Sequence, residues 1–223
     1  MQDGEVNKMI FSTLVQALLK SEIRDKTILV RSLPFVGVVL LLFAFAFDPD
    51  RGILESIAPG LWWVTTTFAA LFIYVRDAHN KIESKYISQF GIEGSTLFLA
   101  RVCVNAILTG IVAFISGVLT LLFFSPEIAN LHLVLVVGVL TTISLATIGA
   151  IYSPLVAKLH DSGQLLSLIV IPILLPGLLC AIRATEAALD SSPRQSLGWI
   201  SLLSLFSVLF LAAGTMASDS LED

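Results

Sequence analysis

The chain has 223 residues, of which 56% are hydrophobic and only 13% are charged, and its mean hydropathy is +0.91. About a quarter of the residues in ordinary soluble domains are charged, so this composition predicts a membrane protein. The net charge of −4 comes from 17 acidic and 13 basic residues dispersed along the chain, which argues against nucleic acid as a partner, because nucleic-acid binders gather their Lys and Arg on one surface.

Residues 1–27 are expected to form an amphipathic helix that lies on the cytoplasmic membrane surface. Apolar side chains recur at three- and four-residue intervals from Val6 to Ile23, whereas Lys20 and Glu22 fall largely off this apolar face. The charged residues also interrupt any stretch that would serve as a secretory signal. The same pattern is compatible with a solvated helix packed on a partner, or with a long cytoplasmic approach to the first span.

Six apolar runs follow, each of about the length that a helix needs to cross a bilayer. They cover approximately residues 28–47, 60–75, 97–124, 131–152, 165–182 and 197–216. Polar segments that would not lie in lipid separate these runs. The sequence therefore predicts an all-α, polytopic protein with a six-span transmembrane domain over residues 28–216 and a tail over residues 217–223.

The distribution of basic residues predicts the orientation of these spans. All of the 13 Lys and Arg residues except Arg51, Arg183 and Arg194 fall on the side shared by the N-terminal segment, the second and fourth loops and the tail. Because loops rich in Lys and Arg stay on the cytoplasmic side, both termini are expected to be cytoplasmic.

The fifth run contains helix breakers at Pro172, Pro176 and Gly177. Each proline removes one backbone hydrogen bond, so a straight helix is not expected there. Two interpretations remain open. The helix is either kinked and stabilised by its neighbours, or broken into a segment that lines a pathway.

Two further groups of residues invite an interpretation. Trp62 and Trp63 open the second run, where an indole pair is typical of an interfacial anchor; haem stacking is the less favoured alternative. The predicted outer side also gathers a polar cluster, which forms either a polar vestibule or simply the solvated part of short loops. This outer cluster comprises Asp48, Arg51, Glu55, Arg183 and Glu186.

The sequence offers no set of residues for catalysis or for metal binding. It lacks the Gly-Lys-Ser/Thr pattern that cradles phosphates and the His-Glu-x-x-His pattern of zinc enzymes. Its three histidines lie in three separate loops, and two cysteines are too few for a four-ligand site. We therefore expect a non-catalytic chain that binds no cofactor directly.

Several segments carry a resemblance over nearly the whole chain, in order and in spacing. They are FAFAFDP at 43–49, APGLWWV at 58–64, the spacing of Arg101 and Asn105, and LLPGLL at 174–179 followed by ATEA at 184–187. Together with the six-span topology, these segments resemble the CcmB family, the membrane subunit of the so-called haem exporter in cytochrome c maturation.

The resemblance implies the membrane domain of a type 2 ABC exporter in the bacterial inner membrane. The implied partners are the ATPase CcmA, which binds ATP, the haem-handling subunit CcmC, the small subunit CcmD and the haem chaperone CcmE. Haem is the possible cargo or the group carried by the released chaperone. The alternatives are a type 2 exporter subunit for another substrate, such as a lipid or a drug, and an intramembrane enzyme, for which no residue set is visible.

A chain without a nucleotide site must receive work from a separate ATPase, and we expect two cytoplasmic segments to form the coupling surface. One is the end of the N-terminal helix. The other is the loop at 76–91, whose sequence departs from the family pattern. The candidate coupling residues are Lys20, Glu22, Arg24, Asp25, Arg76, Glu83 and Lys85. Alternatively, the bases merely hold the chain at anionic lipid, at about 1 kcal/mol each.

Overall fold

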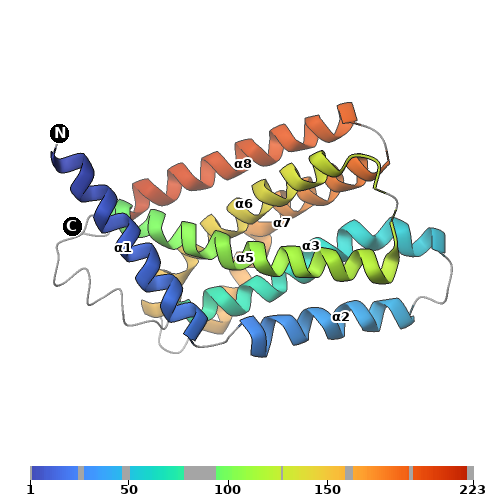
Figure 1. Cartoon of the computed structure of the whole chain (residues 1–223), viewed down its shortest axis with the longest axis horizontal. Coiled ribbons are helices and arrows are strands. Elements are labelled where there is room, and N and C mark those ends of the chain that lie inside the picture. The colour runs from blue at the N-terminus through green and yellow to red at the C-terminus, as the bar shows by residue number, and fades with distance from the viewer. Residues whose placement is uncertain are drawn as a thin grey trace.

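The computed structural model describes residues 2–24, 28–46, 51–77, 94–126, 128–158, 163–190 and 193–219, and within these ranges its regular elements are all helices (Figure 1). The elements are α1 (Gln2–Arg24), the π-helix η1 (Ile28–Ser32), α2 (Leu33–Ala46), α3 (Arg51–Asp77), α5 (Gly94–Phe124), α6 (Leu131–Lys158), α7 (Gly163–Leu189) and α8 (Pro193–Asp219). The all-α prediction is confirmed for the described residues.

Five of these helices are long and apolar enough to cross a membrane. The candidate spans are Glu55–Val75, Gly94–Phe124, Leu131–Tyr152, Pro172–Leu189 and Arg194–Ser218. The predicted first span corresponds to a shorter apolar helix, Val30–Ala46, formed by part of η1 and by α2. Five of the six predicted spans thus have the length of a crossing, and the crossing of α2 stays a prediction.

Two spans have boundaries that differ from those expected. Helix α3 begins at Arg51, and Pro59 lies inside it, although the apolar run that we expected to form this span starts at about residue 60. A proline lacks only its own N–H and its hydrogen bond to the carbonyl four residues earlier, so a helix can continue through it where other contacts hold the chain. Helix α7 continues to Leu189, beyond the expected end of the fifth run at residue 182. Its packing on α3, α6 and α8 stabilises this extension.

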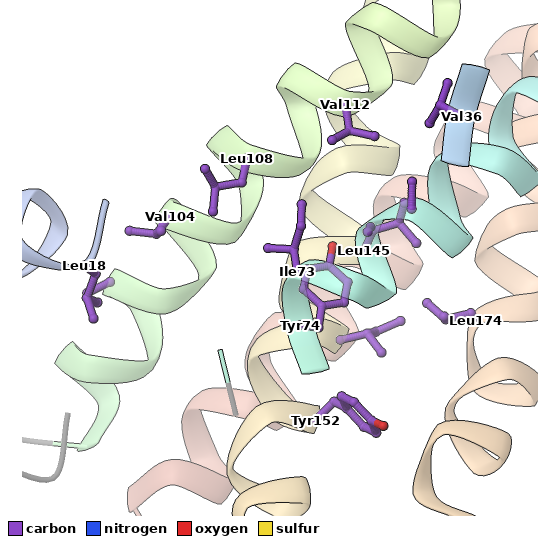
Figure 2. Close-up of a cluster of buried hydrophobic side chains, with 14 of the residues drawn as sticks. Leu18, Val36, Ile73, Tyr74, Val104, Leu108, Val112, Leu145, Tyr152 and Leu174 are labelled. Carbon is purple, nitrogen blue, oxygen red and sulfur yellow. The ribbon is translucent and has the colours of Figure 1, made fainter. Parts of the chain in front are cut away.

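The core of the bundle is built around α5, which contacts α1, α2, α3, α6 and α8. A cluster of buried side chains from α5 and from five other helices, α1, α2, α3, α6 and α7, forms this core (Figure 2). Leu18 of α1 and Tyr152 of α6 mark two members of this cluster that lie far apart in the sequence. Helix α5 therefore connects the N-terminal helix to the apolar centre of the molecule.

The helices alternate in direction, so that their ends gather at two ends of the bundle (Figure 1). We call the end that holds α1 and the last turn of α8 the terminal end, and the opposite end, with the segment from Ser125 to Asn130, the turn end. Helix α1 runs obliquely to the other helices across the terminal end (Figure 1). The start of α1 and the end of α8 both lie at this end (Figure 1).

Candidate functional site

A seam of hydrogen bonds joins α3 to α5 inside the apolar bundle. The indole N–H of Trp62 donates to the carbonyl of Ala113 over 2.9 Å, and the hydroxyls of Thr66 and Ser116 share a hydrogen bond of 2.7 Å. Gly117 leaves room for the Trp62 ring, because a Cβ at position 117 would lie only 3.0 Å from the ring. Residues 62 and 66 are one helical turn apart, so they present their polar atoms to the same neighbour.

Trp63 forms the corresponding contact between α3 and α7. Its indole is 0% exposed and donates to the hydroxyl of Thr185 over 2.8 Å. The Trp62 and Trp63 rings are stacked, with centroids 4.4 Å apart. The prediction that the pair anchors the chain at the membrane surface is wrong for Trp63, whose polar atom finds its partner inside the protein. A ring enclosed in this way also offers no open face for haem stacking.

Nearer the terminal end, Tyr74 continues the seam. Its hydroxyl lies 2.8 Å from the hydroxyl of Thr109 on α5, and its ring lies against Gly149 of α6, where an added Cβ would come within 2.6 Å of it. These hydroxyl residues were not among the site residues predicted from the sequence. The available signal was the series of Thr and Ser at helical spacing in otherwise apolar spans, which is typical of interhelical contacts in membranes.

A small cavity lies beside the seam at the turn end, between α3, α5, α6 and α7. Its volume is about 160 Å³, and its wall includes Ala58, Trp62, Gly117, Thr120, Leu135 and Thr185. A cavity of about 150 Å³ is large enough to hold benzene. The four-ring macrocycle of haem is several times larger, so this cavity does not form a haem site in the present conformation.

The outer cluster is brought together only in part. Arg183 and Glu186 form an ion pair of 2.9 Å one turn apart on α7, and Glu55 is exposed near the start of α3. Arg51 is the first residue of α3, but the structure does not describe its side chain. Asp48 lies outside the described residues. An exposed pair at this spacing contributes about 0.3–0.5 kcal/mol, so it stabilises the helix end only slightly.

The candidate coupling residues divide between exposed and buried positions. Lys20 is exposed on α1, whereas Glu22 is only 6% exposed. The expectation that Glu22 lies off the packed face is therefore wrong. Leu14, Leu18 and Glu22 follow one another at intervals of four residues, and this stripe is the buried one.

The side chains of the remaining coupling residues lie outside the part of the chain that the structure describes. Arg24 ends α1 and Arg76 lies in the last turn of α3, both with side chains outside the described set. Asp25, Glu83 and Lys85 lie outside the described residues. What the structure does place is α1 itself, which packs on α5.

The segment in which we expected a helix break belongs to one continuous helix. Helix α7 runs through both Pro172 and Pro176, whose side chains are exposed. Gly177 is buried where α7 meets α8, and a Cβ there would come within 2.7 Å of the Phe206 ring. Gly177 thus permits close packing of two helices, and the interpretation of two separate half-helices is wrong for the described residues 163–190.

Within the described part of the chain, no group of three or more His, Cys, Asp and Glu residues could hold a metal ion. Cys103 and Cys180 are free thiols on different helices. His132 is exposed at the start of α6, and His79 and His160 lie outside the described residues. The function must therefore be sought in the contacts between helices, in the cavity and in the charged residues at the helix ends.

Comparison with known proteins gives a consistent result. The model of the family described as "CcmB protein" matches residues 9–221. A protein named Heme exporter protein B from Haemophilus influenzae is 30% identical over 183 residues, which cover 81% of this chain and 83% of that protein. Its namesake from Pseudomonas aeruginosa is 25% identical over 217 residues, with 94% and 97% covered. That from Paracoccus denitrificans is 28% identical over 197 residues, with 85% and 84% covered.

Proposed function

Because the chain belongs to the CcmB protein family, we propose that it is the membrane subunit of a haem export system that serves cytochrome c maturation. The family match over residues 9–221 carries this proposal, since it extends over nearly the whole chain. The relatives named Heme exporter protein B are also matched along most of their own length. An all-helical chain with five apolar spans suits such a subunit.

The subunit acts with a separate ATPase and is not itself catalytic. Its sequence has no phosphate-binding loop, so ATP is bound by the partner CcmA. The complex further includes CcmC and CcmD, and its cycle acts on haem or on the haem-loaded chaperone CcmE. The bacterial inner membrane is the compartment in which such a complex operates.

Six crossings place both termini in the cytoplasm. In support, α2 runs alongside the longer helices (Figure 1), and η1 extends it by five residues to Ile28. The basic residues favour the terminal end as the cytoplasmic one. The turn end, with the pair of Arg183 and Glu186, then faces the outside.

Work from the ATPase enters through α1 and the loop after α3. Lys20 and Arg24, with the loop residues Glu83 and Lys85, supply the charges that meet the partner. Glu22 has a different role from these, because it is buried with Leu14 and Leu18. A displacement of α1 is passed to α5 by this packing, and from α5 to α3 by the hydrogen bonds of the seam.

Deletion of the gene in its own host tests the proposed function. We expect c-type cytochromes, detected by haem staining of membrane and periplasmic fractions, to disappear and to return when the gene is supplied on a plasmid. Cytochromes of the b type, which hold haem without covalent attachment, serve as the control and should persist. Normal levels of c-type cytochromes in the deletion strain would contradict the proposal.

A further inference from the structure

The cavity at the turn end has a wall whose hydrogen-bond donors already have partners within the protein. Its polar side chains are Trp62, Thr120 and Thr185. The Trp62 N–H donates to Ala113, and the hydroxyls of Thr120 and Thr185 donate to the carbonyls one turn earlier in their own helices. None of these groups has a donor left for a ligand, and most of the other lining residues are apolar, so the cavity favours an apolar occupant.

The entrance of the cavity is apolar as well. Phe114 on α5 is 71% exposed and Leu135 on α6 is 59% exposed, and both line the cavity. They belong to the candidate spans Gly94–Phe124 and Leu131–Tyr152. Side chains of this kind on the outside of a span face acyl chains, so the cavity opens toward the hydrocarbon of the bilayer.

The depth of the cavity agrees with this environment. Trp62 lies seven residues after Glu55, where the α3 span begins, which corresponds to about 10 Å at the rise of an α-helix. The hydrocarbon core is about 30 Å thick, so the indole lies within the acyl region of one leaflet rather than at its midplane. The cavity volume of about 160 Å³ accepts part of one acyl chain and little more.

We propose that this cavity binds the acyl chain of a bilayer phospholipid, which enters between α5 and α6 and contacts the indole of Trp62. The bound chain fills the space that α3, α5, α6 and α7 leave open beside the seam. This inference concerns the chain alone and holds whatever cargo the complex moves.

Fluorescence quenching by brominated lipid tests the proposal. The full chain carrying Trp199→Phe is placed in vesicles of phosphatidylethanolamine and phosphatidylglycerol whose acyl chains are brominated in the half nearer the methyl end, because a leaflet is about 15 Å deep and Trp62 lies about 10 Å into it. Trp63 is fully buried, so the emission quenched by contact with bromine is that of Trp62. We expect strong quenching, which Trp62→Phe in the same background removes, and weaker quenching by lipid brominated close to the headgroup.

Two variants alter the cavity in opposite directions. Ala58→Leu fills the buried wall and should reduce quenching to the level of the Trp62→Phe protein, whereas Leu135→Ala widens the entrance and should increase it. Ala213→Leu adds the same group to an exposed position of α8 and should leave the quenching unchanged.

Several results would overturn the proposal. One is quenching of Trp62 that Ala58→Leu leaves unchanged in a protein with normal helicity. If Ala58→Leu does not fold, the decision falls to Leu135→Ala, and unchanged or weaker quenching there counts against the acyl chain. Absence of quenching in pure lipid, followed by a shift of Trp62 emission when the other membrane subunits are added, would assign the cavity to an apolar side chain of a partner instead.

Discussion

The Thr185 hydroxyl makes two hydrogen bonds at once in the interior of the bundle. It accepts from the indole of Trp63 and donates to the carbonyl of Ala181, so none of these groups needs water. Interhelical hydrogen bonds in membranes contribute on average about 0.6 kcal/mol. Leaving a buried donor without an acceptor costs more than this, because the donor is desolvated in either case.

Thr185→Val is therefore expected to lower the free energy of unfolding by about 1–3 kcal/mol, since it leaves the Trp63 N–H buried without an acceptor. Thermal unfolding in detergent measures the change. Thr215→Val on α8, where the hydroxyl bonds only within its own helix, is the control and should have a smaller effect. In a Trp63→Phe background the Thr185 change should lose most of its cost, and strict additivity would contradict the assigned hydrogen bond.

Gly149 lies where α6 packs so closely on Tyr74 that a larger residue should destabilise the fold. Gly149→Ala would bring a Cβ within 2.6 Å of the Tyr74 ring, and that ring is held by full burial and by its bond to Thr109. We expect a loss of about 1–3 kcal/mol in unfolding free energy, as for other overpacked sites. Gly138→Ala on the same helix meets nothing within 4 Å and should cause no loss. Equal losses in both variants would assign the effect to the helix backbone.

At the scale of elements, apolar runs predicted most spans well because composition alone determines where a helix is stable in lipid. The fourth run, at residues 131–152, coincides with the candidate span of α6. The start of α3 was missed, because a proline that ends a helix and one that a helix tolerates are identical in sequence. Only the contacts around Pro59 distinguish the two cases.

The faces of the helices were harder to predict than their lengths. Glu22 was placed off the apolar face because the N-terminal pattern is broad, and the docking of α1 on α5 selects the stripe of Leu14 and Leu18 that includes it. Trp63 was assigned to the interface from the usual location of tryptophan, whereas a hydroxyl 122 positions later in the chain determines where its N–H points. Such long-range partners leave no periodic signal in the sequence.

The prolines of α7 lead to a prediction about this helix as a whole. Pro176 denies a donor to the carbonyl of Pro172, and Pro172 denies one to that of Leu168. Replacing both prolines by alanine restores these two backbone hydrogen bonds, so the middle of α7 should yield less easily during the transport cycle, while the packing near Thr185 stays intact. We expect the variant to assemble in the membrane but to mature cytochrome c less efficiently.

Haem staining and immunoblotting of the membrane fraction measure these two outcomes for the double proline variant. Leu175→Ala, a change at a neighbouring exposed position of α7, is the matched control. Full maturation by a well-assembled double variant would mean that the prolines are simply tolerated and that the two missing backbone hydrogen bonds have no part in the cycle.

At the scale of the whole molecule, the positions of the two termini at one end of the bundle predict the topology (Figure 1). An alkaline phosphatase fusion after Asp223 should be inactive, because the enzyme folds only outside the cytoplasm, whereas a fusion in the segment between α7 and α8 should be active. A green fluorescent protein fusion at Asp223 should fluoresce, which controls for expression. An active phosphatase at Asp223 would contradict an even number of crossings with a cytoplasmic N-terminus.

The arrangement of α1 and α5 predicts how the molecule receives work. Helix α1 touches the bundle chiefly through α5, and α5 in turn contacts α2, α3, α6 and α8, so a force on α1 reaches the seam without passing through a loop. The ATPase must then bind to charged groups at the terminal end. Arg24 on α1 and Lys85 in the loop after α3 are the candidates that we select, one from each segment of the proposed coupling surface.

Arg24→Glu and Lys85→Glu are therefore expected to weaken co-purification of the ATPase in detergent, or to reduce the stimulation of its ATP hydrolysis by the membrane subunits. Arg194→Glu, at the start of α8 on the turn end, reverses the same kind of charge on the opposite side and should leave both readouts unchanged. Bases that serve only to hold anionic lipid lose about 1 kcal/mol of membrane attraction each when replaced, and in detergent this loss is invisible. Unchanged association and unchanged hydrolysis in both variants would thus assign these bases to the lipid and leave α1 without a coupling role.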